Sequence, residues 1–64
     1  MWTVIYMANS LKTAEKVKKI MIKEGFLVRL RIIDKYVDKN GCYEVMVPYS
    51  EAIDAQNILI RNGL

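Results

Sequence analysis

The side chains that could carry out catalysis are few in this chain and lack partners at useful spacing. Histidine is absent, and Cys42 is the one cysteine among 64 residues. Cys42 therefore has no histidine to activate its thiol, and a lone cysteine on a strand is usually structural. The carboxylates are scattered, so they predict neither an acid–base pair nor a metal-ligand set. Gly25, Gly41 and Gly63 are isolated and form no phosphate-binding loop. We expect no enzymatic activity, no metal and no cofactor.

Positive charge recurs at helical spacing near the start of the chain. The net charge is +3, and the stripe consists of Lys12, Lys16, Lys19 and Lys23. Such a stripe could contact phosphate or an acidic partner, in a contact that weakens with salt. No aromatic residue is interleaved with these lysines, so the simpler interpretation is a solvated helix face.

The residue types and capping residues near the start of the chain predict a strand followed by a helix. Residues 2–7 are rich in strand-favouring types. Asn9 and Ser10 are good N-cap residues for a helix over residues 11–24. Gly25 follows that segment, as a glycine often does at a helix C-terminus.

The second half of the chain reads as a hairpin and a helix. Alternating apolar residues predict a second strand over residues 26–33. The polar segment 34–41 ends in a turn signature, and a third strand is predicted over residues 42–47. A second helix then runs from Glu51 to about Asn62.

These elements predict one α+β domain over residues 1–64. A strand–helix–strand crossover places its strands parallel in one sheet. The hairpin then returns the third strand between them, which gives the order 1-3-2 with both helices on one face. This is a ferredoxin-like two-layer plait with βαββα order, lacking the last strand of a βαββαβ unit. The first strand becomes a sheet edge, and unpaired edge groups invite another strand.

The sheet face without helices is the candidate association surface. Alternation directs Leu30 toward the helices and Arg29 and Arg31 to the open side. On the third strand, Glu44 and Met46 are expected on the same open side.

The first strand is ambiguous, because both of its faces are largely apolar. We expect Ile5 and Met7 inward and the aromatic residues outward, since amphipathic rings tolerate a half-wet surface. An apolar, aromatic and arginine-bearing face resembles an interface core. The predicted association surface is Trp2, Val4, Tyr6, Arg29, Arg31 and Met46.

Small size favours an oligomer. A chain of this length buries only about 60% of the surface that its unfolded form exposes. With no disulfide or metal to stabilise it, association is the remaining route, and we expect a dimer or trimer or a protein partner. A single cysteine, no apolar stretch of membrane length and no signal-peptide pattern predict a cytoplasmic protein without a membrane partner.

Two other binding functions remain open. An RNA-recognition sheet stacks bases on its aromatic residues, a part that Tyr6 with Arg29 or Arg31 could play. Glu44 and the absence of an outward aromatic residue on the third strand argue against it, so nucleic acid ranks third. The loop residues Asp34, Tyr36 and Lys39 could instead contact a ligand or partner, although such loops are often plain connectors.

Three segments resemble a known family. They are MWTVIY at residues 1–6, EGFLV at 24–28 and VMVP at 45–48, which leads into a short helix. The pattern is similar to short bacterial signal-transducing proteins of unknown function with a PII-like (GlnB-like) ferredoxin fold. The resemblance covers nearly the whole chain and implies a regulatory or binding role. It also supplies the second-ranked function, a small-ligand sensor of PII or ACT type for a nucleotide, 2-oxoglutarate or an amino acid. PII proteins use a long loop between strands two and three, which here is only residues 34–41.

Overall fold

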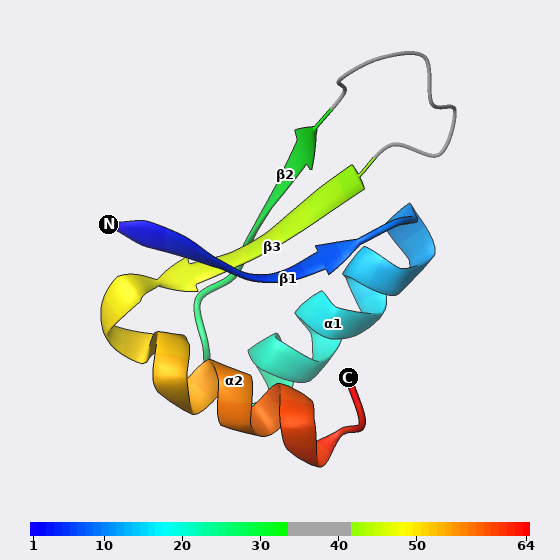
Figure 1. Ribbon diagram of the computed structural model, residues 1–64. Helices are drawn as coiled ribbons and strands as arrows, with labels where there is room; N and C mark the ends of the chain where they lie inside the picture. The colour runs from blue at the N-terminus through cyan, green and yellow to red at the C-terminus, as the bar shows by residue number, and fades with distance from the viewer. Residues whose placement is uncertain (34–41) are drawn as a thin grey trace.

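A computed structural model describes residues 1–33 and 42–64 of the chain. The elements are β1 (Trp2–Ala8), α1 (Leu11–Lys23), β2 (Arg29–Ile33), β3 (Cys42–Pro48), a 3-10 turn (Tyr49–Glu51) and α2 (Ala52–Arg61) (Figure 1). This βαββα order confirms the predicted one. The second strand is shorter than predicted, because it begins at Arg29 and not at residue 26.

The sheet has the predicted order, β1-β3-β2. Both neighbouring pairs are antiparallel, so β1 and β2 form the two edges of the described sheet. Both helices lie on one face: α1 packs across all three strands, and α2 packs on β1 and β3. We call the opposite side of the sheet the open face.

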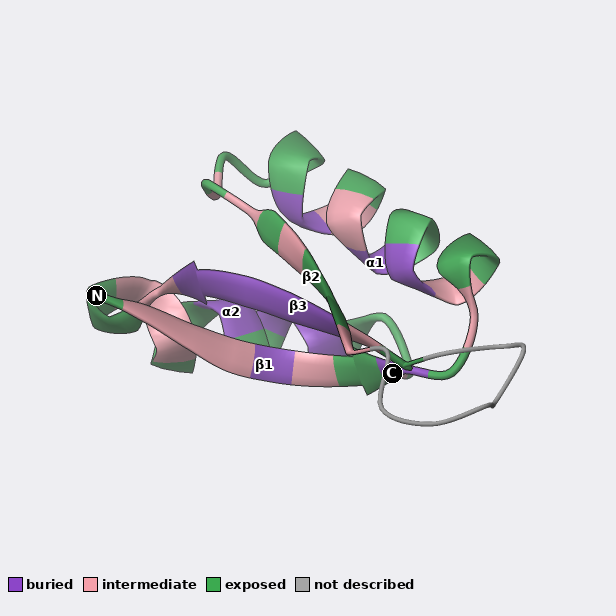
Figure 2. Cartoon of the chain, turned by 90° about the horizontal axis from the view of Figure 1, so that it is seen from above, coloured by how far each residue is buried: buried purple, intermediate pink, exposed green. Residues whose placement is uncertain are grey.

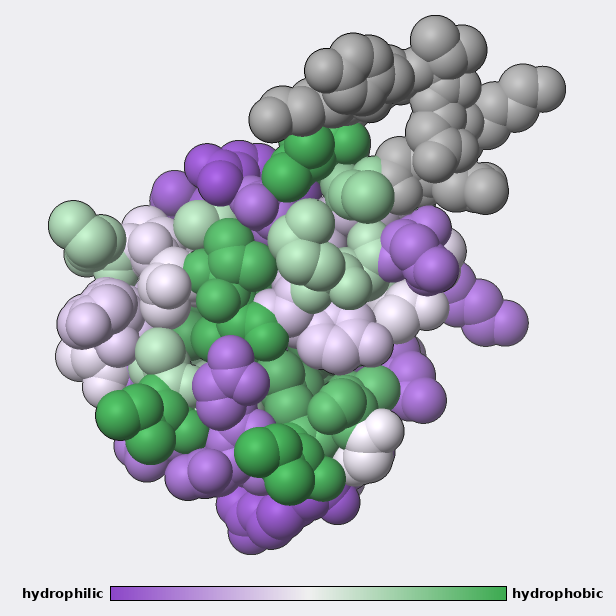
Figure 3. Space-filling view, viewed as in Figure 1, coloured by the Kyte–Doolittle hydropathy of each residue, from purple (hydrophilic) through white to green (hydrophobic). Residues whose placement is uncertain are grey.

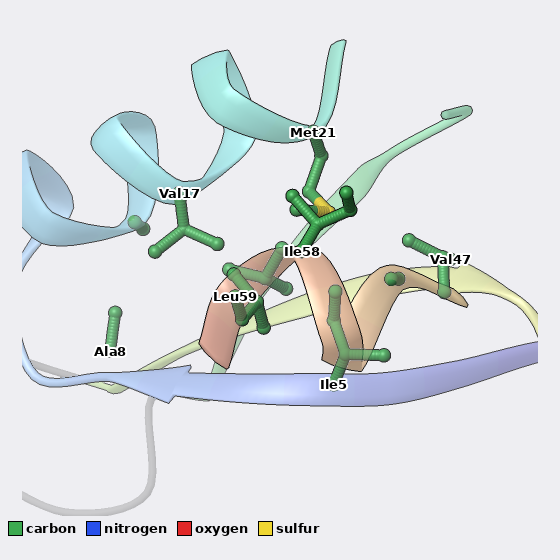
Figure 4. Packing of buried hydrophobic residues seen from close by; sticks show 10 residues of the cluster. Ile5, Ala8, Val17, Met21, Val47, Ile58 and Leu59 are labelled. Carbon is green, nitrogen blue, oxygen red and sulfur yellow. The ribbon is translucent and has the colours of Figure 1, made fainter. Parts of the chain in front are cut away.

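The hydrophobic core lies between the sheet and the helices. Each helix buries residues three and four positions apart, which places them on one side. These residues are Ala14, Val17 and Met21 in α1, and Ala55, Ile58 and Leu59 in α2. Figure 4 shows Val17 and Met21 of α1 and Ile58 and Leu59 of α2 meeting Ile5, Ala8 and Val47 of the sheet. The buried side of α1 faces the strands, and its outer side is exposed (Figure 2).

Both helices end with the same capping arrangement. Gly25 and Gly63 have positive φ angles of 92° and 75°, which glycine adopts without a steric penalty. The N–H of the next residue then reaches back five positions: Phe26 donates to Met21 O at 3.0 Å, and Leu64 donates to Leu59 O at 2.9 Å. Phe26 and Leu64 both pack against the core. The caps therefore fix where each chain segment returns to the core.

The start of α1 is capped as its sequence predicts. Ser10 is the N-cap, and its hydroxyl accepts a hydrogen bond from the Thr13 N–H at 3.2 Å. In the described part of the chain, neither helix has the length and apolar character needed to cross a membrane.

Candidate association surface

A β-bulge in β1 decides which residues reach the open face. The register changes from Val4 opposite Met46 to Tyr6 opposite Val45, which leaves Ile5 as an extra residue. A bulge places both of its residues opposite one partner and interrupts the alternation of side chains. Ile5 and Tyr6 therefore lie on the same side of the sheet as Val45, which is fully buried in the core.

The bulge overturns part of the predicted surface. Tyr6 was expected on the open face, but it packs against the core on the helix side. Met7 was expected inward, but it lies opposite Glu44 on the open face and is 53% exposed. Tyr6, the aromatic residue on which the RNA hypothesis depends, is thus turned away from the open face. The inward position of Ile5 is confirmed.

Trp2, Val4, Met46 and Arg29 form one cluster on the open face. Met46 of the central strand lies between Val4 and Arg29 in the register. The Arg29 guanidinium lies 4.6 Å from the centre of the Trp2 ring, a cation–π contact that spans from β2 to β1. Met46 is only 8% exposed although no helix lies on this face. Its cover must come from these neighbouring side chains.

Arg31 and Glu44 form an ion pair beside this cluster. Arg31 Nε donates to Glu44 Oε1 at 2.6 Å. The two residues lie directly opposite each other on β2 and β3. The carboxylate side chain is largely covered, whereas the arginine side chain is 59% exposed. The pair neutralises the one acidic group of this face among the described residues, so Arg29 contributes the remaining charge there.

The hydrogen-bonding pattern of β1 shows which of its backbone groups point away from β3. Tyr49 N–H donates to Met1 O at 2.7 Å, so these two residues form a hydrogen-bonded pair. Such pairs alternate along an antiparallel ladder, which makes Thr3 and Val47 the next one. The N–H and C=O groups of Trp2 and Val4 consequently point away from β3. We call this side of β1 the β1 edge.

Helix α2 closes part of the β1 edge. The Gln56 Nε2 amide donates to the Ile5 carbonyl oxygen at 3.3 Å. That side chain satisfies the backbone at the bulge, where a regular strand could not pair. The segment left open for pairing is therefore the short stretch from Trp2 to Val4.

The sequence reasoning missed an exposed apolar surface on α2. Tyr49 is 69% exposed, Ile53 78% and Ile60 69%, and we call these three residues the α2 stripe. The spacing of Ile53 and Ile60 could have predicted this surface, because residues seven positions apart lie on one side of a helix. Apolar residues also occupy the other sides of this short helix, so the pattern did not distinguish the exposed side from the buried one.

The other predicted groups are the α1 lysines, a metal-ligand set and the loop between β2 and β3. The four lysines of the α1 stripe are exposed, and the described residues that line a depression beside them all belong to α1. Among the described residues, no group of three or more histidine, cysteine or acidic residues is placed to hold a metal ion. The predicted ligand loop, Asp34, Tyr36 and Lys39, lies outside the described residues.

Comparisons with known proteins leave the chain without an assigned relative. No family model matches it, no curated protein matches it, and no solved structure matches it. The β1 edge and the open face are therefore the features from which a function can be inferred.

Proposed function

We propose that this chain is a small, non-enzymatic interaction module of the cytoplasm that self-associates through the β1 edge and the adjoining open face. A regulatory role, as in signal-transducing proteins, is part of this proposal. The observation that carries it is the outward direction of the Trp2 and Val4 backbone groups on an edge strand that bears no charge. Unpaired groups of this kind are a template for another strand.

The two edges of the sheet differ in their ability to pair with a copy of themselves. Edge strands usually avoid pairing through charged residues or proline. β2 carries Arg29 and Arg31, so two β2 edges would bring like charges together. β1 has the sequence WTVIYMA, with neither a charge nor a proline. Among the described residues, the bulge and Gln56 are the features that limit pairing of β1, and both act beyond Val4.

Antiparallel pairing of two β1 edges gives a self-complementary contact. Centred on Thr3, it places Trp2 of each copy opposite Val4 of the other. Both residues of this pair lie on the open face, where an aromatic and a β-branched side chain attract by about 0.2–1 kcal/mol. The contact occurs twice because a two-fold axis repeats every interaction. The open faces of the two copies then form one continuous surface.

A proline at position 4 tests this proposal. The Val4 N–H points to solvent in a single copy, and proline is tolerated at such positions of an edge strand. Val4→Pro should therefore keep the fold, as judged by far-ultraviolet circular dichroism, but remove a donor that the pairing needs. Val4→Thr is the matched control, because it keeps the N–H and the β-branched shape.

Sedimentation velocity over a concentration series provides the readout. We expect the wild-type chain and Val4→Thr to form dimers as concentration rises, and Val4→Pro to stay monomeric. A wild-type chain that is strictly monomeric at high micromolar concentration would refute self-association. A folded Val4→Pro variant that dimerises like the wild type would refute pairing through the β1 edge.

A further inference from the structure

The strand β2 forms the other edge of the sheet, and its backbone also presents groups for pairing. Along an antiparallel ladder, successive residues of the central strand bond alternately to its two neighbours. Val47 of β3 bonds toward β1, so Met46 bonds toward β2, where it lies opposite Arg29. The N–H and C=O groups of Leu30 and Ile32 consequently point away from β3. We call this side of β2 the β2 edge; in the described part of the chain, no strand pairs with it.

The β2 edge is positively charged on the open face. Arg29 and Arg31 both point to that face and are exposed. A guanidinium has five N–H donors, and Arg31 directs two of its nitrogens at a single oxygen of Glu44. Its other donors can therefore bind a second carboxylate. The two arginines also outnumber the one glutamate opposite them, so this side of the β2 edge keeps a positive charge.

The helix side of the β2 edge is apolar. Ile32 alternates with the arginines and so points to the side of the helices, yet it is 65% exposed. In Figure 3, strongly hydrophobic and strongly hydrophilic side chains lie next to each other over β2. The two faces of this one edge thus differ in the chemistry that they offer.

One flank of α1 adds to the apolar side. α1 packs on β2, and Figure 2 shows the two elements alongside each other. On a helical projection, Leu11 and Ile22 lie roughly 90–110° from the buried side of α1, both on the same flank. The right-handed strand–helix–strand crossover turns that flank toward β2. Leu11 is 48% exposed and Ile22 is 54% exposed. We call Leu11, Ile22 and Ile32 the β2 apolar strip.

We propose that the β2 edge binds an extended segment of a partner protein in which acidic and apolar residues alternate. Side chains of a strand point alternately to the two faces of a sheet. One set would meet Arg29 and Arg31, and the other would cover the β2 apolar strip. The backbone of the segment would bond to Leu30 and Ile32, as in other complexes where a peptide adds a strand to a sheet.

Charge identifies the occupant as a different protein. Two β2 edges would bring Arg29 and Arg31 of both copies together, and like charges opposite each other are destabilising. The β1 strand of a second copy has no acidic residue to meet them. Charges on an edge strand normally deter pairing, but an acidic strand turns the same charges into an attraction. The site lies on the edge opposite the one proposed for self-association, so a dimer could hold two partner segments.

A short peptide tests the inference. The probe is a peptide of about seven residues with blocked ends that alternates valine and glutamate. As it is added to the protein, the amide NMR signals of Leu30 and Ile32 should shift, and those of Trp2 and Val4 on the β1 edge should not. One control peptide alternates valine and lysine. The other has the composition of the probe with its valines and glutamates in two separate blocks, and both should bind at least about tenfold more weakly.

Charge and backbone variants test the two halves of the recognition. Arg29→Glu should weaken probe binding about tenfold and strengthen binding of the lysine peptide, because the charge on the open face is reversed. Ile32→Pro should remove binding, since it deletes an outward N–H at an edge position where proline is tolerated. Ile32→Val keeps that N–H and should bind within about twofold of the wild type.

A serine variant tests the β2 apolar strip. Ile22→Ser should weaken probe binding several-fold, because it removes apolar surface that the probe would cover. Ile53→Ser is the matched control, since Ile53 of the α2 stripe is also exposed but lies on the other helix. It should leave binding unchanged.

Several outcomes would overturn the inference, and they differ from those that bear on self-association. No shift at Leu30 and Ile32 with millimolar probe would refute it, as would shifts confined to Trp2 and Val4. Equal binding of the lysine peptide would refute recognition of acidic residues, and a folded Ile32→Pro variant that binds normally would refute strand addition. A wild-type chain that is monomeric in sedimentation but binds the probe at Leu30 and Ile32 would support this inference and refute only the proposed self-association.

Discussion

The contact between Arg29 and Trp2 allows a quantitative test of what stabilises the open face. It joins the two edge strands across β3, and it contributes to the cover of Met46. We consider three variants: Trp2→Leu, Arg29→Met and their combination. Methionine keeps an aliphatic chain near Met46 while it removes the charge that the ring attracts. A double-mutant cycle then isolates the coupling between the two side chains.

The expected coupling follows from the exposure of the pair. Arg29 is exposed and Trp2 is half-buried, so the cation–π attraction should be about 0.5–1 kcal/mol. For 64 residues, an unfolding entropy of about 2.1 cal/mol/K per residue gives about 0.13 kcal/mol/K. The coupling thus corresponds to roughly 4–7 °C in Tm. Such a shift is readily measured.

Urea unfolding followed by circular dichroism at low protein concentration measures this coupling in the monomer. The fluorescence of Trp2 is unsuitable as a probe because that residue is itself changed. Arg31→Met combined with Trp2→Leu is the control pair, and its effects should add, because the Arg31 guanidinium pairs with Glu44. A coupling below about 0.3 kcal/mol, or an equal coupling in the control pair, would show that the reasoning is wrong.

Two further predictions concern the helices. Gly25→Ala should destabilise the chain by about 1–2 kcal/mol in thermal unfolding, because alanine is strained at a φ of +92°. No atom within 4 Å would meet the added methyl group, so the loss would come from the backbone conformation. An unchanged Tm would contradict this explanation. Met21→Ala should cost about 2–5 kcal/mol in urea unfolding, since Met21 is fully buried. That approaches the total of about 3–10 kcal/mol expected for this size, so a loss under about 1 kcal/mol would contradict the assigned core.

The path of the chain was predictable from sequence because its signals are local. Ser10 and Gly25 delimit α1, and the crossover rule with a short hairpin leaves few ways to order three strands. The outward positions of Arg29 and Arg31 followed from simple alternation on β2, which has no irregularity.

The candidate surface was harder to predict because it depends on one irregular residue. In β1 both faces are apolar, so polarity could not show where the alternation breaks at Ile5. Tyr6 and Met7 were consequently assigned to the wrong faces. The contact of Arg29 with Trp2 also joins strands that are not neighbours, and sequence spacing carries no information on such a diagonal pair.

The bulge at Ile5 has a consequence for how this chain would vary in length. Deleting that residue would leave Val4 opposite Met46 and bring Tyr6 into the next position, opposite Val45, as it is now. Every other side chain of β1 would keep its face, and a regular ladder would replace the irregular one. A one-residue deletion in a strand normally turns its remaining half over. Here it would remove one buried isoleucine and restore regular geometry, so homologous chains aligned to this one could carry a gap within their first strand without losing the sheet.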